Sequence, residues 1–137
     1  MKIFFVCKYN RFRSRVAESY FNLKNKTKKI TASSGGVIVG RYPLNEREVK
    51  IAEEYGIKIT GPPKEIRFED LVRQDLIIVV ANDVPRKIFN SKRFEKKVIV
   101  WSIPDVYPGD NKGILRSRIA EIKKRVDKLI KRLEKEK

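Results

Sequence analysis

The chain has 137 residues, enough for one hydrophobic core, and 41% of them are hydrophobic. One cysteine and no histidine exclude an intramolecular disulfide and argue against a structural zinc site, so no metal is expected. The opening apolar run of five residues is too short for a signal peptide, and no apolar run approaches a membrane span. The composition predicts a soluble cytoplasmic protein whose thiol stays reduced.

The formal net charge of +16 is concentrated at the two ends of the chain. Residues 1–29 have a net charge of +8 and residues 111–137 one of +7, which leaves +1 for the 81 residues between them. Such charge is typical of solvated helix faces in proteins rich in lysine and glutamate. The other interpretation is a basic surface that attracts phosphorylated or acidic partners.

The first half of the chain alternates strand-like and helix-like segments. Residues 2–6 (KIFFV) are typical of a buried strand, and apolar residues at helical spacing predict a helix from about Ser14 to Lys24. Residues 29–33 (KITAS) predict a second strand, which Ser34-Gly35-Gly36 would end. A charged helix is expected from about Leu44 to Tyr55.

Two strands and a long helix are expected in the second half. Residues 75–81 (DLIIVVA) are apolar throughout and predict a strand buried on both faces, and 98–101 (VIVW) predict another. From Leu115 to Leu133, apolar residues recur three and four apart, which predicts an amphipathic helix. The pattern predicts a single α/β domain over residues 1–137, with a small doubly wound four-stranded parallel sheet and helices on both faces.

The loop after the first strand, CKYNRFRS (7–14), lies where such folds bind ligands. It leads into a helix N-terminus, whose unpaired N–H groups and dipole favour an anion and also the thiolate form of Cys7. The planar guanidinium of Arg13, six residues later, suits two oxygens of a phosphoryl group. The loop therefore predicts a phosphate-binding site with a cysteine nucleophile. The structural alternative is that Cys7 is only a small buried residue.

Several segments besides this loop carry a resemblance to a known family. The motif V-C-x5-R-S is followed by RVAES, and further similar segments are ITASSGG (30–36), LNEREVKIAEEYGIKIT (44–60), QDLIIVVAND (74–83) and WSIPD (101–105). In this order, and over essentially the whole chain, they resemble the low-molecular-weight protein tyrosine phosphatases. That family also includes thiol-dependent arsenate reductases.

The resemblance implies a cofactor-free phosphomonoester hydrolase, acting on phosphotyrosine proteins or other aryl phosphomonoesters through a phosphocysteine intermediate. Cys7 would be the nucleophile, and Arg13 would hold two phosphoryl oxygens. Ser14 would donate to the thiolate, and Asn10 would tie the loop to neighbours such as Ser33. The phosphate-binding loop of the family falls on Lys8, Tyr9, Asn10, Arg11, Phe12, Arg13 and Ser14.

The resemblance also implies an aspartate as general acid and base, in an Asp-Pro pair after the fourth strand. Asp105 occupies this place, although the next residue is Val106 and Pro104 precedes it. Asp110, in the nearby PGD turn, is the alternative, but its position also suits a helix N-cap.

Substrate recognition is implied by two aromatic residues. Tyr42 and Tyr107 take the places of the family's aromatic walls around the phosphotyrosine ring, although each is also consistent with an ordinary surface aromatic. Arg41 and Lys8 would flank the mouth of the site and favour acidic peptides.

Two other functions stay open. Arsenate reduction would need an external thiol, because residues 81–90 lack the further cysteines of thioredoxin-coupled reductases. A basic phosphate-binding or nucleic-acid-binding module would use the charged ends, which the first and last helices would bring to one face of the sheet. An acidic partner on that face fits the charge; a membrane or nucleic acid is not expected.

Overall fold

The computed structural model describes residues 1–40 and 42–136. In this part of the chain, four parallel strands form one sheet in the order β2-β1-β3-β4. The strands are β1 (Lys2–Cys7), β2 (Thr31–Gly36), β3 (Leu76–Val80) and β4 (Val98–Trp101). The helices are α1 (Arg13–Lys24), α2 (Glu46–Glu53), α3 (Phe68–Val72) and α4 (Lys112–Lys135), with short 3-10 turns η1 (Arg86–Phe89) and η2 (Glu95–Lys97).

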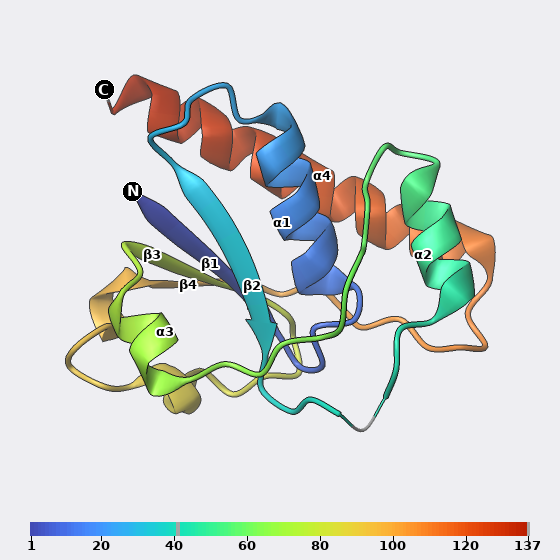
Figure 1. Ribbon diagram of the computed structural model, residues 1–137, viewed down its shortest axis with the longest axis horizontal. Helices are drawn as coiled ribbons and strands as arrows, with labels where there is room; N and C mark the ends of the chain where they lie inside the picture. Colours follow the sequence, from blue (N-terminus) through green and yellow to red (C-terminus); the bar gives the residue numbers. More distant parts are fainter. Residues whose placement is uncertain (41, 137) are drawn as a thin grey trace.

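The helices cover both faces of the sheet, which confirms the predicted doubly wound α/β fold (Figure 1). Side chains alternate along a strand, so Phe5 of β1 faces the apolar residues of α1, α2 and α4, while Phe4 faces those of α3 and η1. Both faces are therefore buried, and this explains the unbroken apolar runs of β1 and β3.

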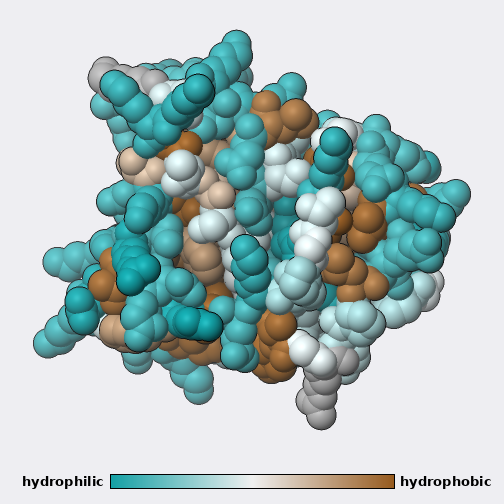
Figure 2. Space-filling model, in the orientation of Figure 1, coloured by the Kyte–Doolittle hydropathy of each residue, from teal (hydrophilic) through white to brown (hydrophobic). Residues whose placement is uncertain are grey.

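The two basic segments of the chain are neighbours in space. Helix α1 packs against α4, as expected for the first and last helices of this topology. Hydrophilic side chains cover most of the face shown in Figure 2. Within the described residues, no helix is long and apolar enough to cross a membrane.

Strand β2 extends beyond its predicted end. Ser34, Gly35 and Gly36 were expected to form a turn, but they pair in parallel register with Phe5, Val6 and Cys7 of β1. The neighbouring strand thus supplies the hydrogen bonds that a local sequence pattern cannot show. As a result β2 reaches the same edge of the sheet as the loop that follows Cys7.

Candidate active site at the carboxyl ends of the strands

The thiol of Cys7 lies at the end of β1, next to the start of α1. Its side chain is buried, with 2% exposure, and its Sγ lies 3.0 Å from Oγ of Ser14 in the first turn of the helix. A hydroxyl at this distance stabilises a thiolate by donating a hydrogen bond. The strand–loop–helix arrangement expected for a nucleophile above an anion site is therefore present.

Asn10 holds the middle of the loop in place. Its φ of 54° is in the left-handed region, which asparagine tolerates better than most residues. Its Nδ2 donates to Oγ of Ser14 at 2.7 Å and to Oγ of Ser34 at 3.0 Å, and its Oδ1 accepts the N–H of Lys64 at 2.9 Å. One buried side chain thus connects the loop with α1, β2 and the segment after α2.

The β2 partner of Asn10 is Ser34, and the prediction of Ser33 was wrong. Ser33 pairs with Phe4 and is exposed, whereas Ser34 pairs with Phe5 and is buried on the side of α1. A shift of one residue along a strand reverses the face to which a side chain points. Ser34 also donates a hydrogen bond to Oε1 of Glu18, which connects the loop to the next turn of α1.

Gly36 lets the loop lie directly against β2. A Cβ atom at this position would come within 2.7 Å of the backbone nitrogen of Asn10 and 2.8 Å of the carbonyl carbon of Tyr9. Only a residue without a side chain fits between this strand and the loop backbone. The path of the phosphate-binding loop therefore depends on a glycine in the neighbouring strand.

Three oxygen atoms hold the guanidinium of Arg13 in place, and the N–H groups of its Nη2 remain unpaired among the described residues. The side chain is 1% exposed, and Nη1 donates to the carbonyl of Ile103 at 2.9 Å. Nη1 also lies 2.9 Å from Oδ1 of Asp83, and Nε lies 3.3 Å from Oδ1 of Asp105. Among the described residues, Nη2 has no hydrogen-bond partner. Buried donors without partners are rare in proteins, and here they fit a ligand that brings its own oxygens.

Asp105 reaches the site from the segment after β4. Its side chain is 9% exposed, and Oδ1 accepts the N–H of Val106 at 2.8 Å. Val106 is fully buried in the core on the α4 side of the sheet. The residue that replaces the family's proline therefore contributes an N–H donor, which proline lacks.

Asp110 has a local structural role. Its Oδ2 accepts the N–H of Tyr107 at 2.7 Å, which closes a turn. It was expected to suit the N-cap of the last helix, but that cap is Asn111, whose side chain accepts the N–H of Ile114 at 2.9 Å. The helix begins one residue later than the turn motif suggested.

Asp83, directly after β3, was not singled out from the sequence. It reaches the guanidinium of Arg13 because the carboxyl ends of parallel strands meet at one edge of the sheet. Its position could have revealed it: Cys7 ends β1, and Asp83 and Asp105 follow within four residues of the ends of β3 and β4.

The two expected aromatic walls differ in their surroundings. Tyr42 is 45% exposed and packs edge-on against Tyr9, with ring centroids 4.9 Å apart. The guanidinium carbon of Arg11 lies 5.8 Å from the Tyr9 ring and 5.7 Å from the Tyr42 ring. Tyr107 is 61% exposed and has no aromatic contact within the described residues. Arg41, the other residue expected at the mouth, lies outside the described residues.

Next to Arg11 lies the buried carboxylate of Glu48, which the sequence did not reveal. Oε1 of Glu48, on α2, lies 4.0 Å from Nη2 of Arg11, and neither carboxylate oxygen has a hydrogen-bond partner among the described residues. Burial raises the pKa of Glu48 to about 7; Arg11 opposes this change, and Asp105 and Asp110 add to it. The site thus includes a carboxyl group that titrates near neutral pH.

Comparisons with known proteins identify the family and related structures. A family model described as low molecular weight phosphotyrosine protein phosphatase matches residues 2–137. A low molecular weight protein tyrosine phosphatase from T. tengcongensis is 28% identical over 96% of this chain and 99% of that chain, with a TM-score of 0.83. An arsenate reductase from Archaeoglobus fulgidus is 29% identical over 93% and 98% of the two chains, with a TM-score of 0.72.

More distant structures share the fold. An arginine phosphatase from Geobacillus stearothermophilus is 20% identical over 98% of this chain and 94% of that chain, with a TM-score of 0.82. At that identity the likeness shows the fold alone. No curated protein matches the chain.

Proposed function

Because the chain belongs to the low molecular weight phosphotyrosine protein phosphatase family, we propose that it hydrolyses phosphomonoesters, above all phosphotyrosine, through a phosphocysteine intermediate. The proposal rests mainly on the environment of the Arg13 side chain. Its guanidinium is buried, two carboxylates and a carbonyl hold it at the end of the loop that begins with Cys7, and Nη2 keeps its donors free.

In the proposed first step, the thiolate of Cys7 attacks phosphorus while the bond to the leaving oxygen breaks. The backbone N–H groups of residues 8–13 and the guanidinium of Arg13 stabilise the charge on the phosphoryl oxygens. Asp105 donates a proton to the leaving oxygen, so that an alcohol or phenol departs. Ser14 supports the thiolate from 3.0 Å.

In the second step, a water molecule attacks the phosphorus of the phosphocysteine. Asp105, now a carboxylate, accepts the proton of the water as the S–P bond breaks, and the thiolate of Cys7 is restored. Asp83 lies on the other side of the guanidinium and is proposed to orient Arg13 in both steps. No step needs a metal ion or cofactor.

Phosphotyrosine is proposed as the substrate because aromatic residues border the loop. The exposed ring of Tyr42, held against Tyr9, would form one wall for a phenyl ring, and exposed Tyr107 would form the other. Lys8 would attract acidic residues of a protein substrate. We further propose that residues 1–137 act as one domain in the cytoplasm, where Cys7 stays reduced.

A second candidate is arsenate reduction, supported by the 29% identity to an arsenate reductase. Cys7 would first bond to arsenic of arsenate as water leaves. The sequence has one cysteine, so a thiol of another molecule would then attack the Cys7 sulfur and form a disulfide, and the S–As electron pair would leave with arsenic as arsenite. Turnover of arsenate that requires an added small thiol, with no turnover of aryl phosphate, would favour this function over the first.

The deciding experiment measures hydrolysis of an aryl phosphate in the presence of a chelator. We expect Cys7→Ser to abolish turnover and Asp105→Asn to lower kcat by about 10² or more. Asp110→Asn is the matched control and should change kcat by less than about threefold, because that carboxylate closes a turn. An equal loss for both aspartate variants would overturn the assignment of the acid.

Substrate class is tested on peptides of one sequence that carry phosphotyrosine, phosphoserine or phosphoarginine. A preference for phosphotyrosine in kcat/KM is expected, and Tyr42→Ala should reduce it. A preference for phosphoarginine would contradict the proposed specificity and leave the cysteine mechanism intact.

A further inference from the structure

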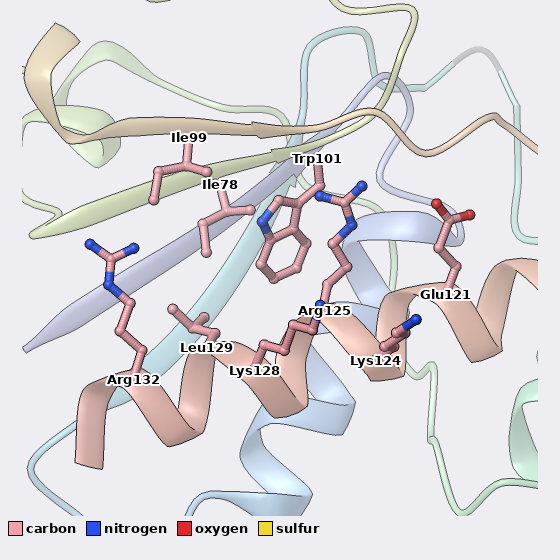
Figure 3. Close-up of a pocket in the computed structure, with 9 residues that line it drawn as sticks. All are labelled: Ile78, Ile99, Trp101, Glu121, Lys124, Arg125, Lys128, Leu129 and Arg132. Atoms are coloured by element: carbon pink, nitrogen blue, oxygen red, sulfur yellow. The ribbon is translucent and has the colours of Figure 1, made fainter. Parts of the chain in front are cut away.

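A groove separates α4 from the β3–β4 side of the sheet, away from the proposed active site. Helix α4 packs against α1 and α2, and a hollow of about 540 Å³ remains between it and the outer strands. Figure 3 shows Ile78, Ile99 and Trp101 pointing from the sheet toward the helix, and Leu129 pointing back toward the sheet. This volume is in the range of small-molecule sites, and the floor is apolar.

The helix side of the groove is strongly basic. Arg125 and Arg132 rise from α4 toward the sheet on the two sides of Ile78 and the Trp101 ring, and Lys128 lies between them along the helix (Figure 3). Glu121 is the one acidic residue among those that line the groove. Arg132 also pairs with exposed Glu136 at 3.4 Å, which leaves Lys124, Arg125 and Lys128 as the groove's basic residues without an ion pair among the described residues.

The indole N–H of Trp101 faces the same space. The Trp101 residue is 7% exposed, but its indole nitrogen is not among the buried polar atoms of the described residues that lack a partner, so its N–H is open to the groove. In Figure 3 the indole nitrogen faces the interior of the groove on the side of Ile78. An indole N–H that is open to a groove can donate a hydrogen bond to a ligand bound there. The apolar floor, the basic rim and this donor all favour one kind of occupant.

We propose that this groove binds a small amphipathic anion: a free carboxylate or organic phosphate with an aliphatic or aromatic body. The body would lie on Ile78, Ile99 and Leu129. The anionic group would lie against Arg125 and Lys128 and accept a hydrogen bond from the Trp101 indole. The anion is attracted by charge complementarity, and the body by burial of apolar surface. None of the proposed catalytic residues lines this groove.

The test uses Trp101 itself as the probe, because it is the one tryptophan of the sequence. Sodium decanoate is titrated below its micelle concentration into the full chain with saturating inorganic phosphate present. The emission of Trp101 and the calorimetric stoichiometry are both recorded. We expect saturable binding of one decanoate, with much weaker responses to decanol, which lacks the charge, and to decyltrimethylammonium, which reverses it.

Four variants connect the response to the groove. The affinity for decanoate should fall about tenfold or more in Arg125→Glu and in Lys128→Glu, and should change less than twofold in Lys131→Glu. Lys131 is exposed on the same helix but outside the groove, so it is the matched control. Trp101→Phe, followed by calorimetry, should bind several-fold more weakly because only the N–H donor and part of the ring are lost. Circular dichroism confirms that each variant is folded.

The alternative outcomes each overturn the proposal. Binding of decanoate only when phosphate is left out would place the anion in the active site. Equal losses in Lys128→Glu and Lys131→Glu would indicate general attraction to a basic helix. Binding to anionic phospholipid vesicles without binding of free decanoate would make the surface a membrane contact.

Discussion

Replacing Glu48 with glutamine should change how the stability of the protein depends on pH. The carboxyl group is 2% exposed and its pKa is about 7 in the folded protein, against an ordinary value of 4.5. The folded state therefore holds the proton more tightly than the unfolded state. This contribution to stability is fully present below pH 4.5 and is lost as the pH rises through about 7.

The magnitude follows from the two pKa values. A difference of one unit between the folded and unfolded pKa values corresponds to about 1.4 kcal/mol. The full contribution of Glu48 to the free energy of unfolding is therefore about 3 kcal/mol. About 2.5 kcal/mol of this is lost between pH 5 and pH 8 by linkage. Arg11, 4.0 Å away, lowers the pKa but does not compensate for burial, because neither oxygen of Glu48 has a hydrogen-bond partner among the described residues.

The assay is urea unfolding of the wild type and of Glu48→Gln at pH 5, 6, 7 and 8. The wild-type free energy of unfolding minus that of the variant should decrease by about 2.5 kcal/mol from pH 5 to pH 8. Glu53→Gln, an exposed position on the same helix, is the control and should give a flat difference. Parallel curves for wild type and Glu48→Gln would refute the reasoning, because they would show an ordinary pKa for Glu48.

Three further predictions concern the phosphate-binding loop. Gly36→Ala should lower kcat/KM more than tenfold, because the new Cβ would lie 2.7 Å from the backbone nitrogen of Asn10. The control is Gly109→Ala, because that position has open space around it. Asn10→Ala should lower the free energy of unfolding by about 1–3 kcal/mol. Asn10→Gly should lower it by less, because glycine accepts the φ of 54°. The opposite order in urea unfolding would contradict this. Peroxide should inactivate Cys7 without protection by a second loop thiol, because the sequence has no other cysteine; full recovery without added thiol would count against it.

The sequence was sufficient to predict the features that depend on local patterns. Buried strands read as continuous apolar runs, so the parallel sheet could be recognised, and the strand–loop–helix around Cys7 and Arg13 placed both groups at one edge of it. Features that depend on contacts between distant segments were missed. Asp83 has no motif of its own, and Glu48 looked like one charge among many on a polar helix, because spacing cannot tell which charged residue faces inward.

The same limit explains the errors in β2. TASSGG has Ala32 as its only hydrophobic residue, so its last three residues predicted a turn. Strand β1 nevertheless pairs with them, and Gly36 allows the loop to approach. Once the strand is extended, alternation assigns Ser34 and not Ser33 to the side of Asn10. One unrecognised pairing thus accounts for both the strand boundary and the wrong hydrogen-bond partner.

The departure from the family's Asp-Pro pair alters how the proposed acid is held. Oδ1 of Asp105 accepts the N–H of Val106 at 2.8 Å and lies 3.3 Å from Nε of Arg13. Proline at position 106 would lack that N–H, and the carboxylate would lose one of these two contacts. Because both contacts use Oδ1, Oδ2 is the atom left to exchange a proton with the substrate. Val106 is itself fixed in the core, so the orientation of the carboxylate follows from the packing of the residue after it.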